Sequence, residues 1–548
     1  MSAIRREFTE PRKIHYNPLQ LKVATINAQT TVVVGGRAIG KTTGIHAPRT
    51  SACLIRMPGS QNGFISRTYK QFKTRIMGSL VGGWKDLGLV EDRDFTIGKK
   101  NKDFPSPKYS IGDYSNAIHF KTGSVLVLIS QDMPGDMNGG NIQSLHGDEA
   151  FQLNKQDLDE NVLPALERGI QAHKSLPEWG NITFTTSMPL TPDGTWIFDY
   201  ENATDAELNS YIMKVYGAWF KLYMKLLERT DLTPKTRETY IYQMKELEEI
   251  LAEFRKDYTL YIEADTFENF HALGEKYFRT QRRVLSDEAF NTQIRNLRPS
   301  GIPKSERFYS LLKELHFYIH YDNSYFENFI YLPEDKDTCY GDLDCKRTDP
   351  LLLSMDFGGI INSLIVCQEK NNFHVLKEFF AEQKDDEFID HLVKKFARYY
   401  QPMSNKRIYL YYDVNGNKKV ANSNETYAEL AKRLLEGFGF EVELMSFGAN
   451  PFHDDKYELM QIALSEIDNR LPRIRVNEAN CPHLKVALYS APVKLVEGKK
   501  KKNKNSERIG SSTDPKNATH ITDALDYVYF SRYRDNLEEN IGSLFMLM

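Results

Sequence analysis

Residues 31–42 read Thr-Val-Val-Val-Gly-Gly-Arg-Ala-Ile-Gly-Lys-Thr, and this stretch decides the fold of the first part of the chain. Its last eight residues fit the phosphate-binding pattern G-x-x-x-x-G-K-[ST], with a Val-rich strand before it and helix-compatible residues after it. Glycines let backbone N–H groups turn toward phosphate oxygens, and a helix N-terminus adds its positive dipole end. Lys41 is predicted to neutralise the β- and γ-phosphates of ATP, and the Thr42 hydroxyl to ligate Mg²⁺. A glycine-rich turn before an ordinary helix is the structural alternative. The nucleotide-binding residues predicted from this loop are Gly35, Gly36, Gly40, Lys41 and Thr42.

A pair of acids, Asp148-Glu149, follows a second strand-like run and suits a strand further across the same sheet. Asp148 is predicted to hold the metal, directly or through water, and Glu149 to polarise the attacking water as general base. Because His146 and Gly147 replace apolar residues in the preceding run, a surface turn is the alternative.

Two smaller signals accompany these motifs. Arg37 lies inside the glycine-rich loop, where its guanidinium can reach the γ-phosphate and stabilise developing charge; a solvated loop arginine is the alternative. Thr185-Thr186-Ser187 follows a β-rich run that begins at Ile182. Small hydroxyls at a strand end can sense a γ-phosphate or a water, although such a run is also a common turn.

The wider pattern predicts two α/β domains joined through a helical segment. Over residues 30–200, short β-rich runs alternate with helical stretches, which is typical of a mainly parallel sheet covered by helices. Residues 203–297 instead carry apolar residues at helical spacing. The β-rich pattern returns at about residue 306. The predicted parts are therefore a P-loop ATPase core at 1–202, a helical subdomain or linker at 203–305, and a second α/β domain at 306–548.

In the second domain, acids stand where buried strands end. Asp356 follows Leu351–Met355, and Asp413 follows Arg407–Tyr412. A late helix places His520 and Asp523 on one face. Ionised carboxylates in such places are costly unless something compensates them, and three of them can hold two Mg²⁺ or Mn²⁺ ions about 3.5–4 Å apart for attack on a phosphodiester. Each acid alone is equally explained as a turn or cap residue.

A dense basic run lies between Val496 and the last helix and is predicted to be a mobile loop or hairpin tip. Each lysine can neutralise one phosphate, a contact that carries no sequence information. A merely solvated charged loop is the alternative. The lysines concerned are Lys499, Lys500, Lys501, Lys502 and Lys504.

The composition of the 548 residues limits the other possibilities. Hydrophobic residues make up 41% and charged residues 26%, which excludes a wholly disordered or collagen-like chain. The formal net charge of -3 gives no global sign of a nucleic-acid partner, so any basic surface must be local. We expect no membrane span, because no apolar run is long enough. Five scattered cysteines fit a reducing compartment.

In their order and spacing, these motifs resemble those of the large terminase subunit of tailed bacteriophages, the motor and nuclease that package DNA into procapsids. The resemblance covers nearly the whole chain, least clearly residues 203–300. Tyr16–Gln20 is similar to the family's adenine-side motif, which implies that Gln20 contacts the base. Gly36–Thr42 resembles its Walker A variant with an early arginine, Asp148-Glu149 its Walker B motif and catalytic glutamate, and Thr185–Ser187 its coupling motif.

The C-terminal half is similar to the RNase-H-like nuclease of that family. By this likeness Asp356, with Phe357-Gly358, provides the first metal ligand and Asp413 the second. The segment His520-x-x-Asp523-Ala524 resembles the form in which both the histidine and the aspartate line the metal site. Because some branches place the last acid differently, Asp526 stays an alternative.

The resemblance implies two linked activities. ATP hydrolysis with Mg²⁺ would drive double-stranded viral DNA into the procapsid, and a metal-dependent endonuclease, using Mg²⁺ or Mn²⁺, would cut the concatemer. The implied partners are the DNA, the portal protein, a small terminase subunit and further copies of the chain in a ring on the procapsid. The implied location is the host cytoplasm, with transient docking on the procapsid and absence from the mature virion.

Two other functions compete with this one. A helicase–nuclease of repair or recombination would normally carry a second motor domain, whereas the second domain here offers strand-end acids. A non-catalytic ATP-binding assembly scaffold would not need the intact set of Lys41, Thr42, Asp148 and Glu149.

Overall fold

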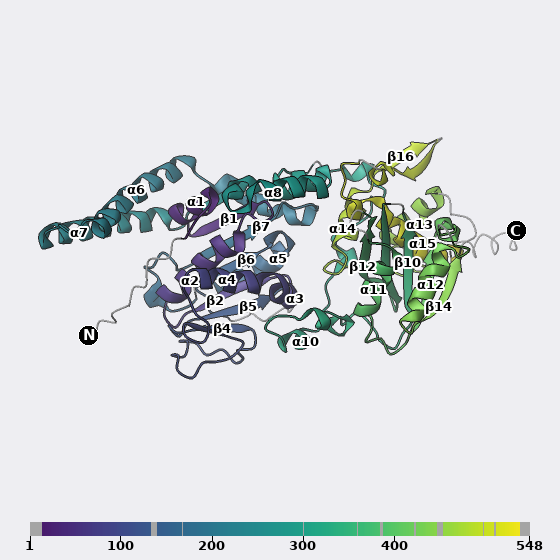
Figure 1. Ribbon diagram of the computed structural model, residues 1–548, viewed down its shortest axis with the longest axis horizontal. Coiled ribbons are helices and arrows are strands. Elements are labelled where there is room, and N and C mark those ends of the chain that lie inside the picture. The colour runs from purple at the N-terminus through teal and green to yellow at the C-terminus, as the bar shows by residue number, and fades with distance from the viewer. Residues whose placement is uncertain are drawn as a thin grey trace. The chain divides into compact units, whose positions relative to one another are not determined.

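The chain folds into two compact units, shown in the computed structural model of Figure 1. The first unit contains residues 1–188, 194–275 and 294–296, and the second contains 189–193, 276–293 and 297–548. Among the residues that the structure describes, no helix is long and apolar enough to cross a membrane. The described residues are 14–132, 140–166, 168–299, 301–358, 360–383, 387–420, 423–446, 453–496, 498–508 and 511–536.

An eight-stranded, mainly parallel sheet organises the first unit, in the order β3-β4-β5-β2-β6-β7-β1-β8. Only the β3–β4 and β4–β5 pairs are antiparallel. The P-loop strand β1 lies between β7 and β8, and β6 lies on the other side of β7. The strands are β1 (Thr30–Gly35), β2 (Gln61–Ser66), β3 (Phe95–Ile97), β4 (Ala117–Phe120), β5 (Val125–Ser130), β6 (Ser144–Asp148), β7 (Asn181–Thr186) and β8 (Thr259–Ala264).

The helices of the first unit begin and end at recognisable signals. Asn17 caps α1 by accepting a hydrogen bond from the Gln20 backbone, and Pro18 occupies its first turn. A single π-helical turn, Thr42–His46, leads from the P-loop into α2. The main helices are α1 (Pro18–Ile26), α2 (Ala47–Arg56), α4 (Met77–Asp86), α6 (Ala206–Glu228) and α7 (Pro234–Arg255), and α8 (Phe270–Val284) leads on to the second unit.

The segment predicted to be helical contains a strand. α6 and α7 are helices, as expected, and pack against each other, but Thr259–Ala264 then forms β8 beside the P-loop strand. The stretch Thr-Leu-Tyr-Ile-Glu-Ala has the β-branched and aromatic residues of a strand, which the helical spacing before it obscured. The predicted three-part division at 202 and 305 stays a prediction, while contacts divide the described chain into the two units above.

A seven-stranded sheet organises the second unit, in the order β14-β13-β10-β11-β12-β15-β9. β11 runs antiparallel to β10 and β12, and the other neighbouring pairs are parallel. An antiparallel meander extended by two parallel strands is the RNase-H-like arrangement. The strands are β9 (Phe317–Tyr318), β10 (Leu351–Phe357), β11 (Ile361–Glu369), β12 (Phe373–Glu382), β13 (Arg407–Tyr412), β14 (Glu441–Ser446) and β15 (Ile474–Asn477).

Helices cover both faces of this sheet, because successive strand residues point to opposite sides. Leu352 belongs to one core with Leu525 of α15, whereas its neighbours Leu351 and Leu353 belong to another with Phe396 of α11. A short hairpin, β16 (Val493–Val496) with β17 (Lys499–Lys502), precedes α15. The helices are α11 (Ile389–Tyr399), α12 (Tyr427–Gly437), α13 (His453–Ser465), α14 (Pro482–Ser490) and α15 (Thr519–Tyr533). The predicted fold class is thus confirmed in both units.

Candidate functional site

Two glycines of the P-loop are required by its geometry. Gly40 has φ +84°, the left-handed region that other residues rarely adopt. A Cβ on Gly36 would lie 2.8 Å from the Thr266 backbone nitrogen and 2.9 Å from the Ile294 carbonyl oxygen. Ala38 also has a positive φ, 61°, so the loop stores backbone strain where phosphates are expected to bind.

Residues far along the chain support the P-loop backbone, and the sequence patterns did not reveal them. The Gly36 N–H donates to the Ala264 carbonyl at 2.9 Å, at the end of β8. The side chains of Thr266, Asn269 and Asn296 donate to the carbonyl oxygens of Arg37, Ala38 and Val34 at 2.8–2.9 Å. Their only sequence signal is their position after β8, the strand that was not predicted.

Lys41 is 8% exposed, and its ammonium points back across the loop. Nζ donates to the Gly35 carbonyl oxygen at 2.8 Å and to Ser187 Oγ at 3.4 Å. The predicted phosphate-binding lysine therefore lies beside the end of β7, where the predicted coupling residues begin.

Asp148 at the end of β6 is held by two hydroxyls from different elements. Thr42 Oγ1 donates to its Oδ2 at 2.5 Å, and Thr185 Oγ1 donates to its Oδ1 at 2.6 Å. Burial alone would raise the pKa of this carboxyl, but nearby His46 and Lys41, with the two hydroxyls, lower it. The structure thus brings together the predicted metal residues of the first domain with one coupling residue.

Glu149 is the next residue and has a left-handed backbone, φ 53°. Its carboxylate lies 3.4 Å from both the backbone nitrogen and Oγ of Ser187. Burial raises the pKa of Glu149, and the neighbouring Asp148 charge adds to this while Lys41 opposes it. A proton acceptor with a raised pKa suits the predicted general base. The third coupling residue, Thr186, accepts the Phe151 N–H at 3.2 Å.

The weak-looking strand before Asp148 has a structural explanation. β6 is completely buried in the middle of the sheet, so neither of its faces is exposed to solvent. His146 Nε2 lies 3.2 Å from Ser144 Oγ, and a Cβ on Gly147 would lie 3.1 Å from Phe184. The surface-turn alternative is therefore wrong.

A buried basic cluster behind Asp148 was not found from the sequence. His46 Nε2 contacts Thr185 Oγ1 at 2.9 Å, and burial lowers its pKa to about 4. Since Thr185 has a single hydroxyl hydrogen and gives it to Asp148, the histidine ring supplies the hydrogen of this contact. Arg49 is also buried, and it donates to Thr183, Asn27, Ala28 and Asn181.

Two predictions about nucleotide contacts remain open. The Gln20 carboxamide donates to the Gly40 carbonyl oxygen at 3.1 Å, and Gln20 is 8% exposed. By this hydrogen bond Gln20 supports the backbone of the P-loop, and its contact with adenine stays a prediction. Arg37 is exposed in the loop, and a residue that reaches the γ-phosphate has to be exposed there. Its contact with the γ-phosphate also stays a prediction.

In the second unit, adjacent strands bring Asp356 and Asp413 together. β10 and β13 are parallel neighbours, and Met355 lies opposite Tyr412. Asp356 follows Met355 and Asp413 follows Tyr412, so the two aspartates lie side by side. Burial raises the pKa of Asp413 to about 6, and the charge of Asp356 adds to it. His520 Nδ1 lies 2.7 Å from Asp356 Oδ2, and this contact raises the histidine pKa against the effect of burial. Two buried, mutually repelling carboxylates fit a bound cation.

Asp523 has different partners. Lys502 Nζ contacts its Oδ1 at 2.7 Å, and Lys504 forms an ion pair with its Oδ2. Lys502 also contacts Asp526 at 2.7 Å and has a fully buried side chain. The prediction that Lys502 contacts DNA is therefore wrong, because this ammonium lies inside the protein.

Of the other lysines in the run, three lie on β17 of the hairpin, and Lys504 follows its end. Lys499 and Lys500 are exposed, Lys501 is half-buried, and Lys500 Nζ contacts Tyr457 Oη at 3.0 Å. Their binding to phosphates stays a prediction. Among the residues with described positions, no three His, Cys, Asp or Glu side chains are arranged to hold one metal ion.

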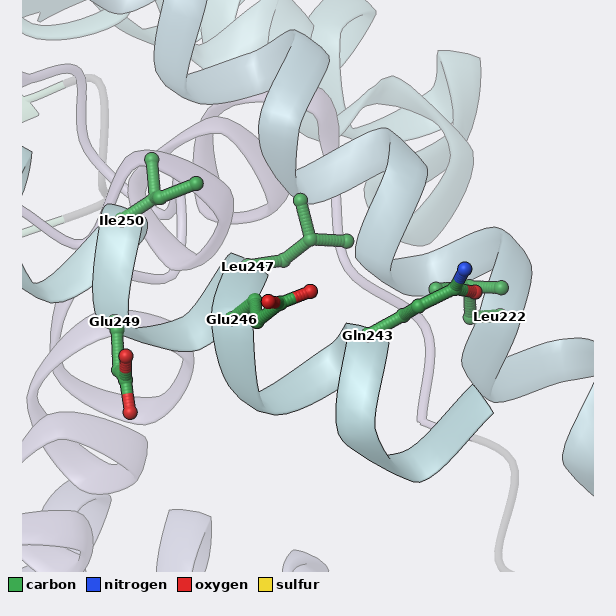
Figure 2. A pocket seen from close by; sticks show the side chains of 6 residues that line it. All are labelled: Leu222, Gln243, Glu246, Leu247, Glu249 and Ile250. Atoms are coloured by element: carbon green, nitrogen blue, oxygen red, sulfur yellow. The ribbon is translucent and has the colours of Figure 1, made fainter. Parts of the chain in front are cut away.

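A groove lies on the helical pair formed by α6 and α7 (Figure 2). Leu222 of α6 and residues of α7 line it, with Gln243 and Glu246 at its polar side. None of the predicted nucleotide, coupling or nuclease residues borders it. Its lining is Leu222, Gln243, Glu246, Leu247, Glu249 and Ile250.

The fold and the two sites define a P-loop ATPase joined to an RNase-H-like unit. Residues 32–299 match the family described as "Terminase large subunit, T4likevirus-type, N-terminal". The terminase large subunit family predicted from the motifs is therefore confirmed for this part of the chain, which is similar to the family's N-terminal region.

Solved structures of low identity were also found. A large terminase from a thermophilic bacteriophage is 11% identical, with a TM-score of 0.36, over 94% of this chain and 99% of that chain. The large terminase ATPase domain of Thermus phage P74-26 is 16% identical, with a TM-score of 0.30, over 52% of this chain and 92% of that chain. Thermus thermophilus RuvC is 12% identical, with a TM-score of 0.16, over 33% of this chain and 95% of that chain. No curated protein sequence matches the chain.

Proposed function

We propose that the first unit hydrolyses ATP to move double-stranded DNA into a procapsid, and that the second unit cuts the DNA with its acidic site. The observation that carries the motor proposal is the position of Asp148 between the hydroxyls of Thr42 and Thr185. One hydroxyl belongs to the nucleotide loop and the other to the coupling run. A change at the nucleotide therefore reaches β7 through a single carboxylate.

The residues of the first unit have separate tasks in this proposal. The P-loop N–H groups and Lys41 bind the phosphates, and Thr42 with Asp148 hold Mg²⁺. That ion screens the charge on the phosphates when it is bound. Glu149, positioned by Ser187, accepts a proton from the attacking water. Arg37 would stabilise the charge that develops on the γ-phosphate.

The second unit would perform the cut. Asp356 and Asp413 would hold a divalent cation, Mg²⁺ or Mn²⁺, which supplies Lewis-acid activation of the phosphodiester when bound. The buried pair fits such an ion because the two negative charges lie together at the ends of β10 and β13. His520 orients Asp356 by the 2.7 Å contact. Lys499, Lys500 and Lys501 would contact the DNA backbone without reading sequence.

The partners and location follow from the same proposal. We expect the chain to act in the host cytoplasm as a ring of copies docked transiently on the portal of the procapsid. A small terminase subunit would guide it to the DNA. We expect it to be absent from the mature virion.

Separate inactivation of the two sites tests the proposal. Full-length Glu149→Gln should lose ATP hydrolysis and keep plasmid cleavage with Mn²⁺, whereas Asp356→Asn should lose cleavage and keep ATP hydrolysis. Exposed acids in each unit, changed as Glu160→Gln and Asp390→Asn, are matched controls that should alter neither activity. Hydrolysis that survives in Glu149→Gln rejects this residue as the base. A folded parent that neither cleaves nor hydrolyses would instead favour the scaffold.

A further inference from the structure

The end of the β16–β17 hairpin delivers two lysines into the acidic site of the second unit. Lys502, the last residue of β17, places its ammonium within 2.7–2.9 Å of oxygens from Tyr309, Thr522, Asp523 and Asp526. Its side chain is 0% exposed, as are those of Asp523 and Asp526. This ammonium is fixed in position, because moving it away would leave two buried carboxylates without a compensating charge.

Lys504 takes the other oxygen of Asp523. Its ammonium pairs with Asp523 Oδ2 and lies 3.4 Å from Glu507 Oε1, and 36% of its side chain stays exposed. Apart from Lys504, Asp523 Oδ2 has no hydrogen-bond partner among the described atoms, although it is buried. Lys504 therefore compensates this oxygen from the open side of the site.

The charges around the acids are unevenly distributed. Asp523 and Asp526 share Lys502, and Lys504 adds a second positive charge at Asp523. Asp356 and Asp413 lie near the same cluster, and the charge of Lys504 also acts on Asp413, but among the described residues His520 is the one basic side chain within ion-pair distance of either acid. Asp356 and Asp413 are thus the acids with the least compensation by nearby positive charge.

We propose that the acidic site takes a single divalent cation, between Asp356 and Asp413, and that Lys504 occupies the place of a second. Lys502 is then a positioning residue that fixes Asp523, and Asp523 is not a metal ligand. This inference rests on the proposed nuclease function of the same site. It replaces the two-ion arrangement predicted from the sequence with one ion and one ammonium group.

Metal stoichiometry in the nucleotide-free full chain tests the inference without relying on activity. Mn²⁺ is titrated by calorimetry, and the ions in the acidic site are counted as the difference between each protein and its Asp356→Asn/Asp413→Asn/Asp523→Asn version. We expect a difference of one ion for the parent. Lys504→Met should raise it to two, since Asp523 Oδ2 then becomes available to a cation.

Two variants separate this effect from damage to the fold. Lys504→Arg keeps the positive charge and should stay at one ion. Lys494→Met removes an exposed lysine from β16 of the same hairpin and should also stay at one. Circular dichroism is used to confirm that each variant is folded before titration.

The possible results have distinct meanings. A difference of two in the parent, or of one in folded Lys504→Met, overturns the inference and leaves the proposed nuclease intact. A difference of zero in the parent overturns both, because the strand-end pair would then bind no cation.

Discussion

At the scale of single residues, the first site depends on a chain of hydroxyls more than on the motif residues alone. Thr185 gives its hydrogen to Asp148 and accepts the hydrogen of buried His46. The sequence motifs predict that Thr185 and Asp148 lie near a nucleotide, but they do not predict the hydrogen bonds that join His46, Thr185 and Asp148. Their arrangement depends on β6 and β7 being neighbours in the sheet.

Thr185→Val should therefore affect both stability and activity. The change leaves the His46 ring hydrogen buried without an acceptor, which should cost about 1–3 kcal/mol in the free energy of unfolding. Asp148 also loses a supporting bond, so ATP hydrolysis should fall about 10–100-fold. Denaturant titration and phosphate release measure the two effects. Thr185→Ser keeps the hydroxyl and should lie near the parent, so an equal loss in that control would contradict the argument.

His46 should make the stability of the first unit depend on pH. Its pKa of about 4 in the folded chain lies below its ordinary value of 6.5, so the unfolded chain binds more protons between these values. The contribution of neutral His46 to the free energy of unfolding is fully present above about pH 6.5. It is lost as the pH falls toward 4, and the loss amounts to up to about 3 kcal/mol. Unfolding midpoints of the parent and His46→Gln across this range measure the difference. Parallel curves would show that His46 does not contribute.

Residue types predicted most of the candidate site, and tertiary contacts decided the rest. Lys41, Thr42, Asp148 and Glu149 stand where their motifs placed them. Lys502 could not be separated from its lysine neighbours by composition, because only the register of β17 turns it inward to Asp523 and Asp526.

At the scale of elements, the β16–β17 hairpin combines two roles in one short segment. Its last residue reaches the acidic cluster, while Lys499 and Lys500 near its turn stay exposed. Exposure falls along β17 away from the turn, through half-buried Lys501 to buried Lys502, so a run of identical residues is divided between surface and interior. The sequence predicted a mobile loop or a hairpin tip, and it did not predict this division.

Removing exposed lysines from the hairpin should weaken DNA binding without changing metal stoichiometry. Lys499→Ser with Lys500→Ser should reduce the slope of log affinity against log salt by about 2, since each phosphate contact contributes about 0.9. Fluorescence anisotropy with double-stranded DNA measures the slope. Lys394→Ser, an exposed lysine on α11, is the control. An unchanged slope in the double variant would mean that these lysines do not contact phosphate.

The core of the second unit should be most sensitive at α15. Leu525 is 0% exposed and belongs to the core that contains Leu352 of β10, so Leu525→Ala should destabilise this unit by about 2–5 kcal/mol. Leu495→Ala, at a side chain that is 71% exposed, should change stability by less than about 0.5 kcal/mol. Chemical denaturation followed by circular dichroism compares them. Similar losses in both variants would contradict the packing described here.

At the scale of the whole molecule, each unit has its own sheet and its own charged site. A ligand that binds one folded unit should raise the unfolding temperature of that unit alone. A non-hydrolysable ATP analogue with Mg²⁺, at 100 times its dissociation constant, should stabilise the first unit by about 2.7 kcal/mol. Calorimetric scans should show this shift in the parent and in Asp356→Asn, and none in Lys41→Ala. A shift that persists in Lys41→Ala would reject the P-loop assignment.

The position of β8 has a consequence for synthesis of the chain. The P-loop strand is made early, yet one of its two neighbours in the sheet is Thr259–Ala264, and Asn296 still has to bond to Val34. A ribosome must therefore translate more than two hundred further codons before the nucleotide loop has its full support. Until then the edge of β1 is unpaired, and a nascent chain paused before residue 259 offers that edge to chaperones or to other chains.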